Sequence, residues 1–376
     1  MNTLKKYARN QVAKVLRRIY GLQKTVLFSS FGGKSYSDNP RAISEKLHEL
    51  FPDIKISWCI KRSKSQYLPK YITPVFEEDK GAVIKAYATS KVIVTNYAFP
   101  DLKKHPKQFF IQTWHGDRAF KKVQYDNPFV HEDYFRPESQ FGFCNLCVAG
   151  SDYGERQFRS AFRYPGEILK VGTPRDDRLV NPNPQEIEEV REKLGVASNT
   201  KILLFAPTVR MSKINGLEVK NLDIERTIAA LELQYKCPWV CFMRGHPGTK
   251  GLVGIQYNDH VIDLSAYEDM ADLLLISDML ITDYSSCSGD FALLHRPIVL
   301  FQEDRDEYLT GERTFYFDIT DSPYWVAENQ EQLEAIISRI STRTAQMNCD
   351  EILQFYGTQE TGNSAETVAE IIAQNL

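Results

Sequence analysis

Long apolar runs are missing from this 376-residue sequence. No stretch approaches the roughly 18 uninterrupted apolar residues that a membrane-spanning helix needs, so we expect that the chain does not cross a bilayer. Seven cysteines are scattered along the chain without the dense spacing of a disulfide scaffold, and no signal peptide with an apolar centre is found. These absences predict a protein of the reducing cytoplasm.

The sequence also lacks an excess of charge and the familiar glycine motifs. Its 46 Lys and Arg against 49 Asp and Glu exclude a general attraction for nucleic acid. Neither GxxxxGK[ST] nor GxGxxG occurs, so the ATPase and dinucleotide-binding motifs are absent. Cys144 and Cys147 have CxxC spacing, but no second pair or nearby histidine completes four ligands, so we expect buried thiols and no metal.

Acidic residues are absent from the amino-terminal segment, where none precedes Asp38. Helical spacing places apolar residues on one face: Leu4, Ala8, Val12, Val15 and Ile19. The candidate membrane-binding basic residues are Lys5, Lys6, Arg9, Lys14, Arg17 and Arg18. The pattern predicts an amphipathic helix over residues 1–24. Such a helix either docks reversibly on an anionic membrane surface or packs on the first domain with its charges solvated.

Two sets of strand-like runs alternate with segments of helical length. The first set comprises TVLFSSF, IKISWCI, KVIVTNY, QFFIQTW and NLCVAGS, and the second comprises KILLFAPT, WVCFMR, HVIDL, MLITDY and PIVLFQ. Helical patterns over residues 38–50, 152–162, 224–235 and 267–276 have the spacing of βαβ crossovers. The sequence therefore predicts an α/β chain of two Rossmann-like domains, 25–180 and 181–376, with a last helix that could cross back to the first.

Two histidines each follow a predicted strand directly. His115 in QTWHGD lies at the carboxyl end of its strand, where open α/β sheets bind ligands, so it suits a general base. Its neighbours Trp114, Gly116 and Asp117 are placed near the same site. His246 follows WVCFMRG, and Arg244 two residues earlier could supply charge beside it. Taken singly, these residues have ordinary alternatives, a histidine held in a turn and a surface arginine.

A cluster of hydroxyl side chains follows the strand in MLITDYSSCSGDF. Backbone N–H groups at the start of the next helix, together with these hydroxyls, suit a phosphate cradle, although one such run is also simple helix capping. A second set of polar residues, Thr208 and Arg210, follows the predicted strand in ILLFAPTVR. Arg210 could either clamp a pyrophosphate or lie in a loop with its charge solvated. The candidate donor-binding residues are Thr208, Arg210, Arg244, Thr282, Asp283, Ser285, Ser286 and Gly289.

Six segments, in order, resemble the CDP-glycerol glycerophosphotransferase family. They are WHG, APTVR, RGHP, DLSAYEDMADLLLISDMLITDYSS, DFALLHRPIVLF and GNSAETV. The resemblance spans Thr25 to the carboxyl end and implies a GT-B architecture, with the acceptor approaching from the first domain and the donor held by the second. It implies His115 as the base on the acceptor hydroxyl and His246 as a second essential histidine, with Arg210 among the residues that bind the donor phosphates.

The implied reaction transfers glycerol phosphate from CDP-glycerol to a polyprenyl-diphosphate-linked disaccharide at the inner membrane surface, releasing CMP without a cofactor. Because that acceptor is membrane-bound, the resemblance implies that the protein is peripheral to the cytoplasmic face of the bacterial cell membrane. The short segment before the first strand favours a primase that adds one unit. The chain departs from the family after WHG, where Asp117 and Arg118 stand, and Asp117 could raise the basicity of His115 or signal another acceptor.

Three alternatives stay open at this point. A GT-B glycosyltransferase using a nucleotide sugar is one, with Glu303 or Glu307 as the residue on the ribose. A ribitol-phosphate transferase is the second. The third is a catalytically idle module that docks membrane glycans, although retention of both histidines and the hydroxyl cluster argues against it.

Overall fold

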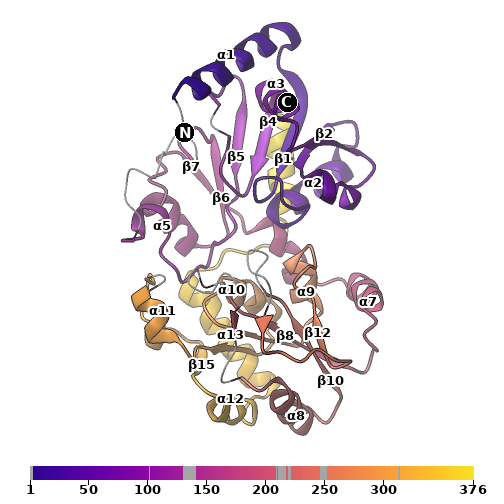
Figure 1. Cartoon of the computed structure of the whole chain (residues 1–376), viewed down its shortest axis with the longest axis vertical. Coiled ribbons are helices and arrows are strands. Elements are labelled where there is room, and N and C mark those ends of the chain that lie inside the picture. Colours follow the sequence, from indigo (N-terminus) through magenta and orange to yellow (C-terminus); the bar gives the residue numbers. More distant parts are fainter. Residues whose placement is uncertain are drawn as a thin grey trace. The chain divides into compact units, whose positions relative to one another are not determined.

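The computed structural model describes residues 3–100, 102–129, 141–208, 210, 217–218, 222–245, 252–311 and 314–376. The chain divides into two compact units (Figure 1). Unit 1 comprises residues 1–117, 130–177 and 359–376, and unit 2 comprises residues 118–129 and 178–358. The chain therefore passes between the units four times, first at the bond between Asp117 and Arg118.

Unit 1 is built on a seven-stranded parallel sheet in the order β3-β2-β1-β4-β5-β6-β7. Its strands are β1 (Gln23–Ser29), β2 (Lys55–Ile60), β3 (Ile72–Phe76), β4 (Ser90–Thr95), β5 (Phe109–Gln112), β6 (Leu146–Ala149) and β7 (Glu167–Lys170). Its helices are α1 (Thr3–Tyr20), α2 (Asp38–Leu50), α3 (Lys80–Thr89), α5 (Asp152–Ser160) and α14 (Ser364–Gln374). The order changes direction between β1 and β4, so their carboxyl ends form the topological switch point.

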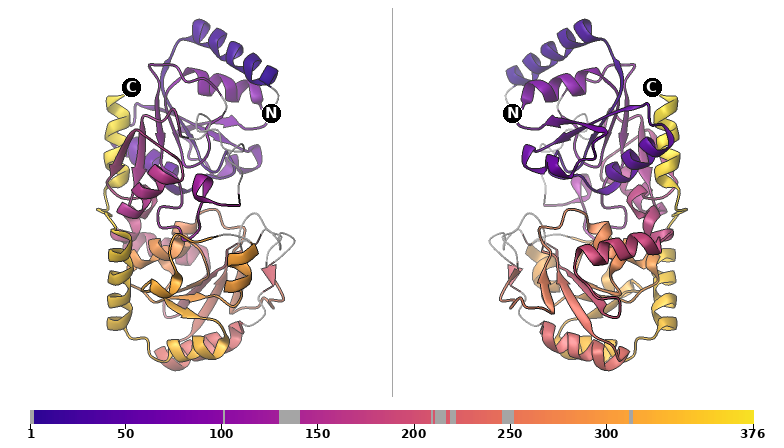
Figure 2. Two further views of the ribbon diagram at one scale, coloured as in Figure 1. Left: turned by 90° about the vertical axis from the view of Figure 1, so that its left-hand side faces the viewer. Right: turned by 90° about the vertical axis from the view of Figure 1, so that its right-hand side faces the viewer.

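Alternation along the strands builds a core on each face of this sheet. Val26 and Phe28 of β1 pack on one face with α2 and with Val368 and Ile372 of α14. Leu27, between them, packs on the other face with α3 and with Ala13 of α1. Figure 2 shows α14, in yellow, running beside the sheet of unit 1. Burial on both faces explains why these strands are continuous apolar runs.

Unit 2 contains a six-stranded parallel sheet in the order β12-β10-β8-β13-β14-β15. Its strands are β8 (Lys201–Ala206), β10 (Trp239–Met243), β12 (Val261–Asp263), β13 (Met279–Thr282), β14 (Ile298–Phe301) and β15 (Trp325–Ala327). Its helices are α7 (Pro184–Lys193), α8 (Ile224–Tyr235), α9 (Met270–Ile276), α10 (Cys287–Phe291), α11 (Arg305–Gly311), α12 (Gln330–Ile337) and α13 (Thr342–Tyr356). Short α6 (Asp177–Val180) lies at the passage from unit 1, and β9 (Leu217–Glu218) pairs with β11 (Leu252–Val253).

The predicted α/β class with parallel sheets is confirmed, and all ten predicted strand segments contain strands. Three further strands of the two sheets, β3, β7 and β15, were not predicted. Each pairs with a neighbour on one side only, and half or more of the residues in each are not fully buried. Edge strands of this kind lack the apolar run that marks a strand buried on both faces.

Among the described residues, no helix is both long and apolar enough to span a membrane. The helix α1 contacts α3. It buries Ala13 completely and packs Leu16 against the same core, whereas Val12, Val15 and Ile19 of the predicted apolar face are exposed. Arg17 points into unit 1, where its guanidinium donates to the carbonyl oxygens of Ala88 at 3.0 Å and Lys103 at 2.8 Å.

Candidate functional site

In unit 1, the half-buried His115 lies just after β5, next to the switch point. Its Nδ1 lies 2.7 Å from the carbonyl oxygen of Asn96, the residue that follows β4. Because a carbonyl oxygen can only accept, Nδ1 of the neutral ring must carry the hydrogen, which leaves the lone pair on Nε2. This tautomer has a proton acceptor at Nε2, as a general base on a hydroxyl requires.

The backbone around His115 is strained and held by buried polar groups. Trp114 has a φ of 53°, which an L-residue adopts only at a cost of roughly 1–3 kcal/mol. The amide of Asn39 holds this conformation by donating to the Trp114 carbonyl oxygen at 3.0 Å. The indole lies beside the imidazole with the ring centroids 4.1 Å apart. Strain of this kind clusters at functional sites.

Asp117 has a structural partner set within unit 1. Its buried carboxylate accepts from the backbone N–H of Gly150 at 3.0 Å and from the hydroxyl of Ser151 at 2.5 Å. Ser151 also caps α5 by accepting from the N–H of Gly154. Asp117 therefore ties the His115 loop to the start of α5, and it is Asn96 rather than Asp117 that bonds Nδ1 of His115.

In unit 2, the candidate donor residues lie at the second switch point. The sheet order changes direction between β8 and β13, whose last residues Ala206 and Thr282 pair directly. Asp283 joins the two following loops, because its buried carboxylate accepts from both the N–H and the hydroxyl of Thr208. The structure thus brings Thr208 and the hydroxyl cluster together at one end of the sheet.

Arg210 is buried in an ion cluster rather than solvated. Its guanidinium donates to Asp283 at 2.8 Å and to both carboxylate oxygens of Asp304, at 2.8 and 3.0 Å. It also lies over the rings of Tyr284 and Tyr308. Burial alone would lower the pKa of Arg210, but the two carboxylates outweigh it and raise the pKa, so the residue is always charged. Among the described residues of this cluster, one cation faces two carboxylates, which leaves no surplus positive charge for a phosphate.

The hydroxyl cluster is divided by burial. Thr282 is completely buried and donates to the carbonyl oxygen of Ala206 at 2.6 Å, whereas Ser285 and Ser286 are partly exposed before α10. Gly289 packs so closely that a Cβ there would lie 2.7 Å from the Cβ of Arg118. Within the cluster, burial raises the pKa of the Cys287 thiol to about 12, which keeps it protonated and unsuited to nucleophilic attack.

Of the two predicted site residues after β10, the structure describes Arg244 but not His246. Arg244 is largely buried, donates to the Tyr267 carbonyl oxygen at 2.8 Å, and has its pKa lowered by burial. His246 lies outside the described residues, so its predicted role stays a prediction.

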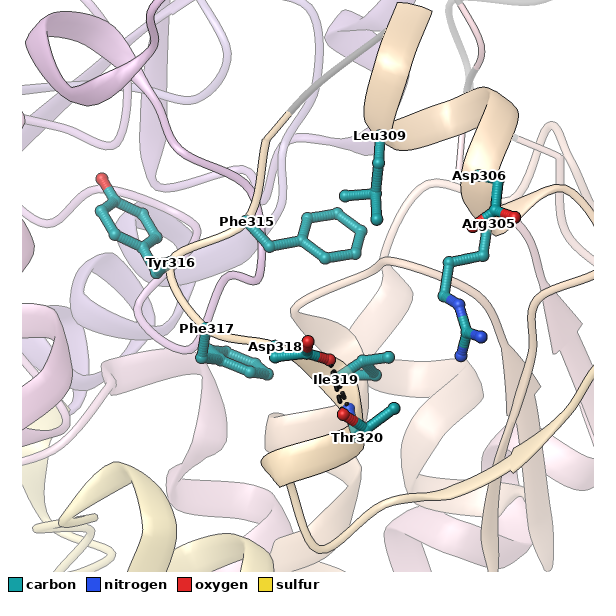
Figure 3. Close-up of a pocket in the computed structure, with 9 residues that line it drawn as sticks. All are labelled: Arg305, Asp306, Leu309, Phe315, Tyr316, Phe317, Asp318, Ile319 and Thr320. Carbon is teal, nitrogen blue, oxygen red and sulfur yellow. Dashed lines mark hydrogen bonds between the residues drawn. The ribbon is translucent and has the colours of Figure 1, made fainter.

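A cavity of ≈ 530 Å³ also opens in unit 2, where the ring centroid of its lining residue Phe315 lies 5.4 Å from that of Tyr284. It is lined by Arg305, Asp306, Leu309 and the segment 315–320 (Figure 3). At its floor the N–H and hydroxyl of Thr320 donate to Asp318. Its arginine is already paired with Glu328 at 2.6 Å. None of the predicted site residues lines it, so we retain the ends of β8 and β13 as the candidate donor site.

Sequence reasoning missed three contributors to these sites. Asn96 acts through its backbone carbonyl oxygen, which no residue pattern reveals. Asp304 follows PIVLFQ as an ordinary loop acid, and Arg118 pairs with Asp290 across 172 residues at 2.7 Å. The position of Asn96, though not its contact with His115, could have been predicted, because it directly follows the strand in KVIVTNY at a switch-point loop.

Two doubly wound parallel sheets, each with polar residues gathered at its switch point, place the chain among the α/β proteins that bind ligands at the carboxyl ends of their strands. A family model described as CDP-Glycerol:Poly(glycerophosphate) glycerophosphotransferase matches residues 12–374. The chain therefore belongs to this family of transferases, as its six motifs predict.

Curated relatives and solved structures agree with this assignment. The chain is 29% identical over 390 residues to a teichoic acid glycerol-phosphate transferase of Staphylococcus aureus, with 99% of each protein covered. It is 30% identical to a teichoic acid poly(glycerol phosphate) polymerase of Staphylococcus epidermidis, covering 94% of this chain but only 51% of that protein's length. A structure of the wall teichoic acid polymerase TagF, a histidine-to-asparagine variant, superposes with a TM-score of 0.84 at 27% identity, covering 99% and 96% of the two chains.

Proposed function

We propose that this chain transfers glycerol phosphate from CDP-glycerol to a hydroxyl of a lipid-linked glycan, in a GT-B arrangement, as a single-unit primase. The acceptor oxygen forms a bond to the glycerol-bearing phosphorus while the bond from that phosphorus to the bridging oxygen breaks, and CMP leaves. His115 takes the acceptor proton at Nε2. The observation that carries the proposal is the hydrogen bond from Nδ1 of His115 to the Asn96 carbonyl oxygen, which sets this tautomer.

The donor phosphates bind in unit 2 at the partly exposed Ser285 and Ser286 and the adjoining backbone. Asp283 and Arg210 act behind this surface, because their charges are already paired with each other and with Asp304. We therefore assign Arg210 to holding the Thr208 and Tyr284 loops rather than to a direct clamp on pyrophosphate. His246 is proposed as the second histidine, on the resemblance alone. A variant of the relative TagF was crystallised and soaked with CDPG, which supports a CDP-linked donor for this chain.

The membrane surface is proposed to be the exposed side of α1. Val12, Val15 and Ile19 project from the side opposite the buried Ala13, and Lys14 and Arg18 are exposed beside them. Exposed apolar side chains flanked by basic ones suit the interface of an anionic bilayer. Arg17 is excluded from this surface because its guanidinium is engaged inside unit 1.

Replacing Ile19 by glutamate should weaken binding to vesicles that contain phosphatidylglycerol by about tenfold or more, because an apolar anchor of ~1.5–3 kcal/mol becomes an anion. Co-sedimentation with vesicles measures this. Leu233→Glu, at an exposed leucine of α8, is the matched control and should bind as the wild type does. Equal binding of Ile19→Glu and wild type would remove α1 from membrane association.

A further inference from the structure

Two aromatic side chains stand at the switch point of unit 1, on the loops that leave β1 and β4. The two strands end side by side, with Ser29 paired to Thr95, and Phe31 and Tyr97 follow each strand by two residues. Phe31 is partly buried, whereas 45% of Tyr97 is exposed. In open α/β sheets, ligands bind outside the carboxyl ends of the strands at such a point.

Buried polar side chains hold both aromatic residues in place. Phe31 has a φ of 48°, an uncommon conformation for a bulky side chain, and its N–H donates to Oδ1 of Asn96 at 2.8 Å. The N–H of Tyr97 donates to the hydroxyl of Thr95, and its carbonyl oxygen accepts from Gln112 at 2.8 Å. Thr95, Asn96 and Gln112 are all buried. Preorganisation of this kind around an exposed ring is typical of a binding surface.

Both rings lie next to the proposed base. The ring centroid of Phe31 is 5.1 Å from that of His115, and the ring centroid of Tyr97 is 6.2 Å from it. Asn96 links two of the three residues, since its amide oxygen accepts from the N–H of Phe31 and its carbonyl oxygen from Nδ1 of His115, and Tyr97 is the next residue in the chain. Gly32 is exposed beside Tyr97, and a Cβ there would lie 3.6 Å from that ring. The glycine therefore leaves this flank of the ring open to a ligand.

The charges behind the rings do not favour an anionic ligand. The carboxylate of Asp38 accepts from the Asn96 amide at 2.9 Å and pairs with Arg175 at 3.3 Å. Asp176 lies 3.6 Å from the same guanidinium. Among the described residues, these two carboxylates face one guanidinium, so this group carries no surplus positive charge. Lys34 is exposed on the loop that carries Phe31, so we use it to test for a bound phosphate.

We propose that Phe31 and Tyr97 form an acceptor subsite that takes the apolar C–H face of a sugar ring and presents its hydroxyl to His115. This rests on the proposed function and narrows its acceptor to a sugar hydroxyl rather than the terminal hydroxyl of a poly(glycerol phosphate) chain. The negative face of an aromatic ring attracts the weakly positive C–H groups of a sugar. A phosphate-bearing chain would instead call for arginine or lysine donors.

The test measures acceptor-dependent CMP release at saturating CDP-glycerol, with a lipid-linked disaccharide as the varied acceptor. Tyr97→Ala should raise the acceptor KM about threefold to tenfold while the KM for CDP-glycerol is unchanged, and Tyr97→Phe should behave as the wild type. Phe31→Ala should act in the same direction. Lys34→Ala is the control, because it should leave the acceptor KM unchanged.

Each outcome bears on one proposal. Wild-type protein that releases no CMP would overturn the proposed function and not the subsite alone. An active wild type whose acceptor KM is unaffected by Tyr97→Ala, in protein with an unchanged circular dichroism spectrum, would overturn the subsite. A rise in acceptor KM for Lys34→Ala but not for Tyr97→Ala would show that a phosphate, not a sugar ring, is recognised.

Discussion

His115→Ala should lower the rate of acceptor-dependent CMP release by about 10²–10⁴-fold, the contribution of a positioned general base. The side chain removed is the one whose Nδ1 hydrogen is fixed on the Asn96 carbonyl oxygen, so that Nε2 takes the proton. Because the residue is only partly buried on a loop, the folded state should persist. The measurement is a steady-state assay together with a thermal unfolding curve.

A second histidine variant serves as the matched control, because it shows whether the rate falls on removal of any histidine or only of His115. His260→Ala removes an exposed histidine that directly precedes β12 in unit 2, and its rate should equal that of the wild type. A well-folded His115→Ala protein with the wild-type rate would remove His115 from the mechanism.

Arg118→Met should destabilise unit 2 by about 3–5 kcal/mol, the cost of leaving one partner of a buried ion pair without its counter-charge. The two side chains, 2.7 Å apart, are 0% and 4% exposed for Arg118 and Asp290. Phe120 beside it is also completely buried, against Phe317 and Tyr324. The residues after WHG, which the sequence suggested as acceptor determinants, therefore include a packed anchor of unit 2. Urea unfolding followed by tryptophan fluorescence measures the change.

Two further variants test this explanation. Arg118→Met combined with Asp290→Leu should recover most of the lost stability, because an apolar pair of similar volume removes the uncompensated carboxylate. Arg226→Met breaks an exposed pair with Glu334 and should shift the unfolding curve far less. If Arg118→Met unfolds at the same urea concentration as the wild type, the buried pair does not stabilise unit 2.

The sheets could be predicted because their central strands are buried on both faces. Val26, Leu27 and Phe28 have no exposed side chain among them, so an apolar run marks the strand. Ile72–Phe76 forms an edge strand with exposed residues and a proline, which reads as a loop from sequence. Pairing across the sheet, rather than local propensity, decides such segments.

The positions of the candidate site residues could be predicted from the sequence, but their hydrogen-bond and ion-pair partners could not. A histidine directly after a strand located His115 at the correct end of the sheet. Its bond to Asn96 joins residues in the loops after two neighbouring strands, β4 and β5, and depends on the backbone path. Arg210 was predicted to clamp the donor pyrophosphate or to lie solvated in a loop. In the structure Asp283 and Asp304, 73 and 94 residues away, enclose it. Such long-range ion pairs are set by the fold and leave no local pattern.

CMP release from CDP-glycerol, with CDP-ribitol and UDP-sugars in parallel and a lipid-linked disaccharide acceptor, tests the proposed function most directly. We expect release from CDP-glycerol that depends on the acceptor and stops after one unit per acceptor. Acceptor-dependent release from CDP-ribitol alone would contradict the donor assignment. Release of UDP from a nucleotide sugar, with no CMP from CDP-glycerol, would contradict the glycerophosphate transfer itself.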